Sequence, residues 1–533
     1  MTRMEVNRRT RPPGPSARQV AHVEVLAAAV VAASERADLL AGRAQEVRHA
    51  GACTAAREPL REVTVQPVRL VRALLPAAEA VLAAAPDDRT ADILRATIGH
   101  SRSVLLQADA GSMRSPAAQL TLLSALARQL LRIQSNGPRP SRPADPTPVW
   151  VPQTSPGPHP HLKDGRYTMP YSPSSPASRI DDDLRSAVSG ATVMVTGGGG
   201  LVGSRITSHL RAAGARVIAV GKLDAYPARV YSDLFGVHAG DRDTVVGDIA
   251  DEALMNAMVR QSDYVIHAAA LADVASCTRN PLAALETNVH GTQVLLGAVR
   301  AHTAKVRRFV FVSSAAVYGN GDPKRQEIRS WHEEQPLAPL SVYANTKVWG
   351  EHQTALVLNA ANVSHAAVRY FSVYGEPQTV KEHSHSWVVA WLAMRAKLGL
   401  PLLLNGGGGQ VRDFVHVDDV AEATIRAVLA PAAHRQVLNV GTGRATSIRE
   451  IADMVVQHYP DAPVETRSLP EGDPLGGYAD TTRMSAALGW EPRISVEQGV
   501  ARYVAWLDQT PGALPDFLRE EAERHRADSA VIA

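Results

Sequence analysis

The stretch ATVMVTGGGGLVGS, residues 191–204, runs from an apolar segment through a group of glycines into the start of a helix. Gly197, Gly200 and Gly203 in it have the spacing GxxGxxG. Between a strand and a helix, the first such glycine permits a tight turn and the second lets the backbone approach a pyrophosphate. The third lets the helix pack closely against the strand. The stretch therefore predicts a dinucleotide-binding loop.

The residues on either side decide between that interpretation and a flexible glycine loop. A helical segment, LVGSRITSHLRAAG, begins at Leu201 and Val202 directly after the glycines. The free N–H groups and partial positive charge at the start of such a helix bind phosphates. A glycine motif alone is weak evidence, but here a strand-like run precedes it and a helix follows it. Both neighbours favour dinucleotide binding.

Strand-like and helical segments alternate from about residue 187 onward. The β-branched runs are VMVT, RVIAV, TVVGDI, YVIHAAA, RRFVFVSS and HAAVRYFSVYG. Such alternation predicts βαβ units and an α/β fold with a doubly wound parallel sheet of Rossmann type. We expect this domain to span 186–510, with a smaller α/β substrate lobe at about 376–510 and a polar tail at 511–533.

The part of the chain before this domain has a different composition. Residues 1–135 are rich in Ala, Leu and Arg with apolar residues at helical spacing, which predicts an all-α accessory module. Residues 136–185 are rich in Pro and Ser without periodicity and are expected to form a linker. We find no catalytic constellation in either segment.

Composition excludes several functional classes. Cys53 and Cys277 are the only cysteines of 533 residues, so a disulfide framework or a cysteine-based metal site is not expected, and a cytoplasmic location fits. The apolar stretch at 25–34 is too short to cross a membrane. The formal charge is +3 and no basic patch is interleaved with aromatic residues, so nucleic acid is not an expected partner.

The end of the second predicted strand bears on the choice of cofactor. An acid there would bind the ribose 2′-hydroxyl of NAD, but RVIAVGKLDAYP has Gly221 at that place. Lys222 could attract the 2′-phosphate of NADP, whereas Asp224 could substitute for the missing acid. The residues leave both cofactors open, with NAD preferred.

Three residues carry the chemistry that we expect. Ser314 ends a predicted strand, and Tyr343 and Lys347 are four residues apart, so they share one face of a helix. Tyrosine ordinarily has a pKa near ~10. A nearby ammonium and a positive nicotinamide ring both favour the phenolate and lower that pKa, which would make Tyr343 a proton acceptor. Ser314 could hold the reacting hydroxyl by a hydrogen bond.

With these motifs, residues 190–508 resemble the extended short-chain dehydrogenase/reductase superfamily in its NAD-dependent sugar-nucleotide epimerase/dehydratase branch. The further matching segments are GDI, HAAALADV, NPLAALETNVHGTQVLL, RYFSVYG, GGGGQVRDFVHVDDVAEA, LNVGTG and DTTRMSAALGWEP. The resemblance implies that Asp248 and Ile249 flank the adenine, and that Ala269 and Ala270 line the cofactor. It also implies that Asn288 braces the helix behind the cofactor.

On the substrate side the resemblance is less complete. It implies that Arg412 binds the substrate diphosphate, which suits a planar guanidinium, and that Asp473 reaches the nucleotide. Ser372 stands where the family has Asn, so one substrate hydrogen bond is shortened or lost. Ala315 and Ala316 stand where the 4,6-dehydratases carry Asp and Glu, the acid and base that expel water. Dehydration and the related decarboxylation are therefore not expected.

The resemblance implies an NAD-dependent 4-epimerase of a nucleoside diphosphate sugar, with UDP as the expected nucleotide and a homodimer as the expected assembly. The alternatives are an NADPH-dependent 4-ketoreductase, favoured by Gly221 and Lys222, and a non-catalytic cofactor-binding protein. A metal site at His383 and His385 is not expected. The acids Asp418 and Asp419 are interpreted as the N-terminal acids of a helix, which its dipole favours.

Overall fold

The computed structural model describes residues 182–238, 241–320, 328–382, 384, 387–469 and 475–532, together with Leu75, Glu79, Ile98 and Arg102. Apart from these four positions and the first residues of α5 (Asp182–Val188), the expected accessory module (1–135) and linker (136–185) lie outside the described residues.

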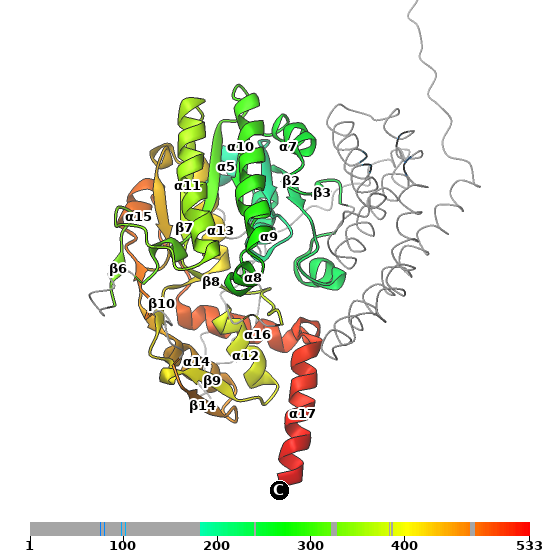
Figure 1. Ribbon diagram of the computed structural model, residues 1–533, viewed down its shortest axis with the longest axis vertical. Coiled ribbons are helices and arrows are strands. Elements are labelled where there is room, and N and C mark those ends of the chain that lie inside the picture. Colours follow the sequence, from blue (N-terminus) through cyan, green and yellow to red (C-terminus); the bar gives the residue numbers. More distant parts are fainter. Residues whose placement is uncertain are drawn as a thin grey trace, which may run out of the picture.

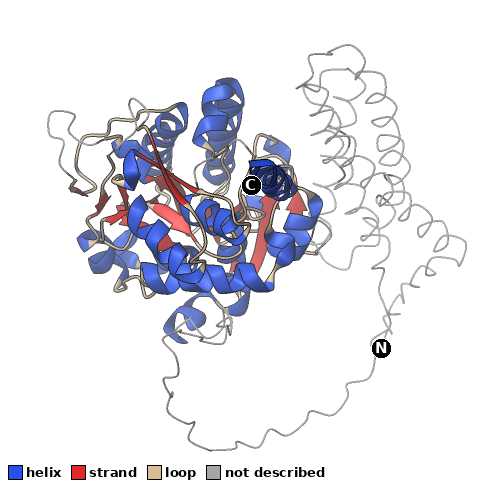
Figure 2. Ribbon diagram, turned by 90° about the horizontal axis from the view of Figure 1, so that it is seen from below, coloured by secondary structure: helices blue, strands red, loops and turns tan. Residues whose placement is uncertain are grey.

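A seven-stranded, wholly parallel sheet forms the centre of the molecule (Figures 1 and 2). Its strands are β1 (Thr192–Thr196), β2 (Arg216–Gly221), β3 (Thr244–Val246), β4 (Tyr264–His267), β5 (Arg308–Ser314), β7 (His365–Tyr370) and β12 (Val437–Val440). Their order is β12-β7-β5-β4-β1-β2-β3, so the direction of strand addition reverses at β1. A doubly wound sheet binds its ligand at this reversal, outside the carboxyl ends of the strands. The predicted Rossmann-type fold is confirmed.

Apolar residues bury both faces of the sheet. In β1, Val193 and Val195 pack into the core on one face and Met194 into the core on the other. Such strands read as continuous apolar runs because helices cover both sides. One face is covered by α5, α6 (Leu201–Ala212), α13 (Val417–Leu429) and α15 (Thr482–Leu488), and the other by α7 (Glu252–Val259), α10 (Thr292–Ala301) and α11 (Val342–Ala360).

Short helices connect these elements near the carboxyl edge of the sheet. They are the π-helical turns η2 (Val230–Leu234) and η3 (Glu286–Gly291), the 3₁₀ turn η4 (Ala315–Tyr318), α8 (Val274–Arg279) and α9 (Pro281–Leu285). The pair β6 (Ser330–Trp331) and β15 (Tyr478–Ala479) lies at the side of the domain. The turn η4 follows β5 directly, which leaves Ser314 at the strand end.

A second core belongs to the smaller lobe. Its strand pairs are β8 (Ser372–Tyr374) with β11 (Phe414–His416), β9 (Leu402–Asn405) with β14 (Val464–Arg467), and β10 (Val411–Arg412) with β13 (Thr446–Ser447). Its helices are α12 (Val388–Lys397), α14 (Ile448–His458) and α16 (Val496–Gln509). Its short 3₁₀ turns are η5 (Gly406–Gly408) and η7 (Pro511–Ala513), whereas η6 (Pro431–Ala433) packs against the core of the sheet.

The expected lobe boundaries need correction. Residues 376–510 do not form one continuous lobe, because α13 returns to cover the sheet and β12 joins it as an outer strand beside β7. The segment expected as a polar tail, 511–533, contains α17 (Asp516–Ile532), which extends from the body in Figure 1. Leu514 and Leu518 bury its start against the lobe core, which explains why it is ordered into a helix.

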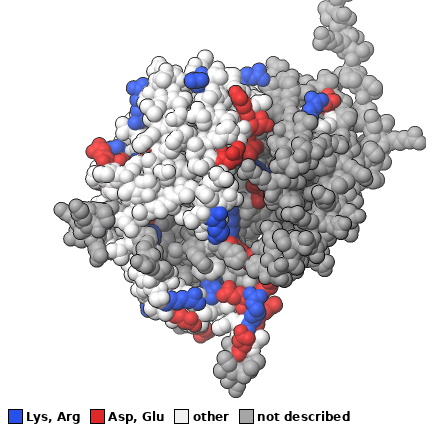
Figure 3. Space-filling model, viewed as in Figure 1, with Lys and Arg blue, Asp and Glu red and all other residues white. Residues whose placement is uncertain are grey.

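None of the helices in the described part of the chain combines the length and apolar character needed to cross a bilayer. On the face drawn in Figure 3, the Lys and Arg side chains of the described residues lie in small separate groups.

Candidate active site

The glycine loop connects β1 to α6 with no room for larger side chains at two positions. Gly197 has a φ of 71°, and a Cβ there would lie 2.7 Å from the backbone nitrogen of Ala269. A Cβ on Gly203 would lie 2.1 Å from the carbonyl oxygen of Gly197. Gly200 is the N-cap of α6, whose first residues are Leu201 and Val202. The loop thus fits a dinucleotide, because the glycines carry no side chains that would keep a phosphate away from the N-terminus of α6.

The second strand ends as the sequence indicated, but its lysine is paired. Gly221 is the last residue of β2, and the next residue, Lys222, places its Nζ 2.6 Å from Oδ2 of Asp248. Asp248 follows the neighbouring strand β3, and Ile249 beside it is buried. The side chain of Asp224 is exposed. The candidate residues for the adenosine end therefore lie at adjacent strand ends.

A chain of hydrogen bonds joins the end of β1, beside the glycine loop, to α11. His267, at the end of β4, contacts the hydroxyls of Thr196 through Nδ1 at 2.7 Å and of Thr292 through Nε2 at 2.8 Å. Thr292 donates to the carbonyl of Asn288. The amide of Asn288 then contacts Leu271 and donates to Thr346 on α11 at 3.0 Å. Asn288 therefore braces α11 through Thr346.

Complete burial decides the charge of this histidine. Burial first, and then the positive charge of Lys347, lower the pKa of His267 to about 3. The ring is therefore neutral, and since Thr292 donates its own hydroxyl proton elsewhere, Nε2 carries the ring proton. Thr196 in turn accepts from the backbone nitrogen of Ala269 at 3.2 Å, which fixes the Ala269–Ala270 segment beside the glycine loop.

The three predicted catalytic residues meet at the carboxyl end of β5. Tyr343 and Lys347 lie one turn apart on α11, whose N-cap is Ser341. The hydroxyl of Tyr343 interacts with the side chain of Ser314. The Nζ of Lys347 lies 5.8 Å from the centre of the Tyr343 ring and donates to the carbonyl of Val312 at 2.8 Å. The carboxyl end of β5 and one face of α11 therefore bring the three side chains together.

The pKa of Tyr343 is raised, whereas the sequence predicted that it would be lowered. Burial raises the pKa of Tyr343 to about 12, although its interaction with Ser314 lowers it. Burial also lowers the pKa of Lys347 to about 8, against the raising effect of Glu351 and Cys277. Desolvation therefore outweighs the interaction with Ser314, which is why the pKa of Tyr343 is raised and not lowered.

Sequence reasoning missed a buried acid behind the catalytic set. Glu351 accepts hydrogen bonds from Nε and Nη2 of Arg369 at 2.9 and 2.7 Å, and from the hydroxyl of Ser313. It lies one further helical turn beyond Lys347, so the spacing YxxxKxxxE was the available signal. Arg369 also donates to the hydroxyl of Tyr318 at 2.8 Å. Charge-assisted bonds of this kind hold β5, β7 and α11 in a fixed relation.

The substrate-side candidates occupy the junction with the lobe. Ser372 starts β8, two residues after Tyr370, which is the strand partner of Ser314. The backbone N–H of Ser372 donates to the carbonyl of Asp413, next to Arg412. Arg412 is half-buried and its Nη1 donates to the carbonyl of Val411.

The remaining residues that the sequence singled out lie partly inside and partly outside the described residues. Asp473, His383 and His385 lie outside the described residues. Ala315 and Ala316 form the start of η4 directly after Ser314. Among the described side chains, no group of three or more His, Cys, Asp and Glu is arranged to hold a metal ion.

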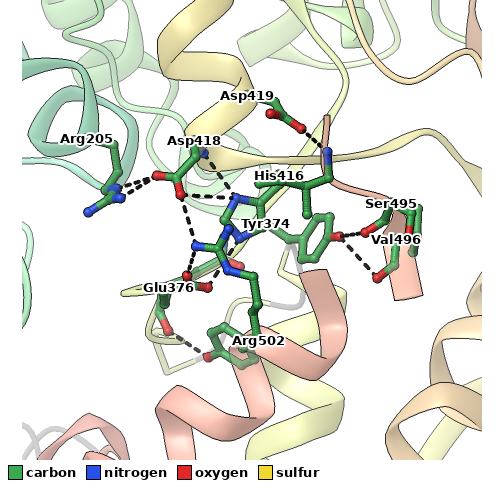
Figure 4. Close-up of polar contacts among 12 residues, drawn as sticks. Arg205, Tyr374, Glu376, His416, Asp418, Asp419, Ser495, Val496 and Arg502 are labelled. Carbon is green, nitrogen blue, oxygen red and sulfur yellow. Dashed lines mark hydrogen bonds and ion pairs between the residues drawn. The ribbon is translucent and has the colours of Figure 1, made fainter. Parts of the chain in front are cut away.

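A buried group of charged side chains fixes the lobe to the cofactor helix (Figure 4). Asp418 accepts from Arg205 on α6 and from Arg502 on α16. Arg502 also pairs with Glu376, where the chain enters the lobe, and His416 lies 3.2 Å from the same carboxylate. Asp418 and its neighbour lie in the first turn of α13, as predicted. These acids therefore serve contacts between elements.

The sequence and the fold of this chain are similar to those of known proteins. The model of the NAD dependent epimerase/dehydratase family matches residues 193–441. A UDP-glucose 4-epimerase of Mycolicibacterium smegmatis is 32% identical over 316 residues, covering 58% of this chain and 96% of that protein. UDP-glucuronic acid decarboxylase 2 of Arabidopsis thaliana is 30% identical over 312 residues, covering 58% of this chain and 67% of that protein. The crystal structure of a UDP-glucose 4-epimerase of Thermus thermophilus in complex with NAD has a TM-score of 0.52 at 31% identity, covering 60% of this chain and 99% of that chain.

Proposed function

The chain belongs to the NAD-dependent epimerase/dehydratase family, and from this premise we propose that it is a 4-epimerase of a nucleoside diphosphate sugar, with UDP as the nucleotide. The reaction passes through a transient 4-keto sugar. NAD, held by the glycine loop and the ends of β2 and β3, would supply the hydride chemistry at C4 of the sugar. The meeting of Ser314, Tyr343 and Lys347 at one strand end, with alanine at the next two positions, carries the proposal.

The side chains of the protein handle the proton. Tyr343, as the phenolate, takes the proton of the 4-hydroxyl while the sugar is oxidised, and returns it to the 4-keto oxygen when the sugar is reduced. Ser314, which contacts the Tyr343 hydroxyl, holds the sugar oxygen within reach. Lys347 places a positive charge beside the Tyr343 ring, which stabilises the phenolate. The cycle consumes no proton and no reducing equivalent.

The alanines after Ser314 support epimerisation over elimination. A 4,6-dehydration needs an acid and a base close to the sugar. Ala315 and Ala316 offer neither at the start of η4. The decarboxylase relatives use the same family fold, so this local difference bears directly on the choice of reaction.

The experiment incubates the purified full-length protein with UDP-, dTDP- and GDP-hexoses and identifies the products by NMR and mass. We expect an equilibrium mixture of C4 epimers without net change in nicotinamide absorbance. The Tyr343→Phe variant is expected to lose this activity and still bind NAD. Steady oxidation of NADPH with a 4-keto sugar would instead identify the 4-ketoreductase, and a fully active Tyr343→Phe would reject the assigned role.

We also propose that the protein is a cytoplasmic homodimer. Leu282 and Leu285 on α9 are 67% and 44% exposed, and Leu356 on the adjacent α11 is 69% exposed. Exposed apolar residues on neighbouring helices favour association. The buried free thiol of Cys277 fits a reducing compartment. Light scattering of the Leu356→Glu variant tests the dimer, since a charge at that position should yield monomer if α11 lies in the interface.

A further inference from the structure

The end of β2 lacks the acid that an NAD-binding strand usually provides, although the structure has space for it. A Cβ on Gly221 would approach no described atom closer than 3.8 Å, the distance to Gly199 N and to Cδ2 of Leu223. The absence of an acid is therefore not imposed by packing. Selection between a 2′-hydroxyl and a 2′-phosphate must come from other side chains at this strand end.

Lys222 is the side chain that would attract a 2′-phosphate, and the fold provides it with a partner. Gly221 is the register partner of Val246 in the parallel pair β2–β3, so Lys222 and Asp248 leave the sheet side by side. Nζ of Lys222 lies 2.6 Å from Oδ2 of Asp248, with the two side chains 34% and 29% exposed. The other oxygen, Oδ1, accepts from the backbone nitrogen of Ala250 at 3.0 Å, which orients the carboxylate.

A second acid also faces this lysine. Asp224 interacts electrostatically with Lys222, Asp248 and Lys381. Lys381 in turn faces Asp273 and places its Nζ 4.2 Å from the centre of the Tyr226 ring. Asp248 therefore pairs with the ammonium next to the strand end, and Asp224 is a second carboxylate that interacts with it electrostatically. A phosphate with about two negative charges would have to displace Asp248 or lie beside both acids.

We propose that the Lys222–Asp248 ion pair replaces the strand-end acid and makes this protein select NAD over NADP. Asp248 occupies the ammonium that would otherwise bind the 2′-phosphate, and it adds a negative charge that repels the phosphate. A ribose hydroxyl needs no cation and can donate to a carboxylate. The inference rests on the cofactor part of the proposed function and not on the sugar reaction.

The test measures cofactor binding without sugar, by calorimetric or fluorescence titration of the full-length protein with NADH and NADPH. The quantity compared is the ratio of the Kd for NADPH to the Kd for NADH. We expect wild type to bind NADPH at least about tenfold more weakly. Asp248→Asn should lower the ratio by about tenfold or more, because Lys222 is released toward the phosphate. If the substitution also removes a contact with the adenine, both cofactors lose the same affinity, and the ratio of the two Kd values does not change for that reason.

A matched control comes from the amino edge of the same sheet. Asp263 pairs with Lys305 at 2.8 Å just before β4, so Asp263→Asn breaks the same kind of ion pair far from the carboxyl ends of the strands. We expect that variant to leave the ratio unchanged. Lys222→Met added to Asp248→Asn should raise the ratio again, because the released lysine is the group that binds the phosphate in the single variant.

Gly221→Asp supplies an independent test that does not disturb Asp248. Restoring the strand-end acid should raise the ratio, and in the Asp248→Asn background it should restore the preference for NADH. Equal affinities in the wild type, an unchanged ratio in Asp248→Asn, or a ratio that stays low when Lys222→Met is added would each overturn the proposal. Normal cofactor ratios without turnover of any sugar would reject the proposed reaction and leave this inference standing.

Discussion

Arg205 on the cofactor helix and Asp418 at the start of α13 form an ion pair whose carboxylate is 1% exposed. The guanidinium Nε lies 2.9 Å from Oδ1, and Arg502 of α16 donates to Oδ2 of the same carboxylate at 3.0 Å. One buried acid thus binds side chains from the cofactor domain and from the lobe. Its removal would leave two arginines without their shared partner.

Asp418→Asn is therefore expected to lower the free energy of unfolding by about 3–5 kcal/mol, the range for breaking a buried charge pair from one side. Thermal unfolding followed by circular dichroism measures the change. Asp453→Asn is the control, because Asp453 forms an exposed i,i+4 pair with Arg449 and should change stability by less than about 0.5 kcal/mol. Equal effects of the two variants would contradict a special role of Asp418.

The stability difference at Asp418 should depend on pH with a defined sign. Burial alone would raise the pKa of Asp418, but hydrogen bonding to His209 and the nearby positive charges hold it well below its usual value. A lowered folded-state pKa contributes stability that is complete above the unfolded pKa and is lost as pH falls toward the folded one. The gap between wild type and Asp418→Asn should be constant from neutral pH to about 5 and narrow below about 4.

Glu351→Gln tests whether the acid behind the catalytic set controls Lys347. Burial lowers the pKa of Lys347, and the carboxylate of Glu351 raises it. Loss of that charge should lower the pKa of the lysine further, so the alkaline limb of the kcat/KM profile moves to lower pH. The buried Arg369 would also lose its charged partner, which is expected to lower stability by about 3 kcal/mol.

Glu422→Gln separates the catalytic effect from the loss of stability. Glu422 is a buried acid on α13, which covers the opposite face of the sheet from α11, and it pairs with Arg426 and Arg493. Its replacement should reduce stability and leave the pH profile in place. A profile that stays unchanged in Glu351→Gln would show that Glu351 is only structural.

The motifs predicted the parts of the site that lie in one short segment each. The glycine loop and the pair Tyr343–Lys347 depend on local spacing, and the structure places them as expected. Contacts between distant segments were not visible, such as Lys222 with Asp248 and Glu351 with Arg369. The sequence did not predict that residues 417–440 return to the sheet. A helix followed by a strand has the same sequence pattern whether it belongs to the sheet domain or to the smaller lobe.

Gly203→Ala is expected to weaken NADH binding by about tenfold or more and to destabilise the protein by about 1–3 kcal/mol, because backbone atoms of the loop must move. The added Cβ would lie 2.1 Å from the Gly197 carbonyl oxygen. Gly297→Ala on α10 is the control, since a Cβ there meets nothing within 4 Å. It should add up to about 1 kcal/mol of helix stability and leave NADH binding intact. Titration and thermal unfolding distinguish the two, and normal NADH affinity in Gly203→Ala would contradict close packing at the loop.

Lys347→Met should separate activity from stability. Its side chain is 4% exposed, and burial lowers its pKa to about 8 from the ordinary value of 10.5. A buried cation with a lowered pKa destabilises the folded protein, here by about 3 kcal/mol. The hydrogen bond from Lys347 to Val312 offsets about 1 kcal/mol of that cost. The variant should therefore lose activity by at least about 100-fold and yet unfold at a temperature no lower than wild type at pH 7.

The stability advantage of Lys347→Met should shrink as the pH rises. Between pH 8 and about 10 the unfolded state of the wild type binds more protons at Lys347 than the folded state, so wild-type stability from this group rises with pH. Lys347→Met lacks that rise, and its advantage should be greatest below pH 8 and diminish toward pH 10. Thermal unfolding of both proteins across this range measures the difference. A variant that is less stable than wild type below pH 8 would contradict this prediction. It would mean that the charged Lys347 side chain stabilises the folded protein.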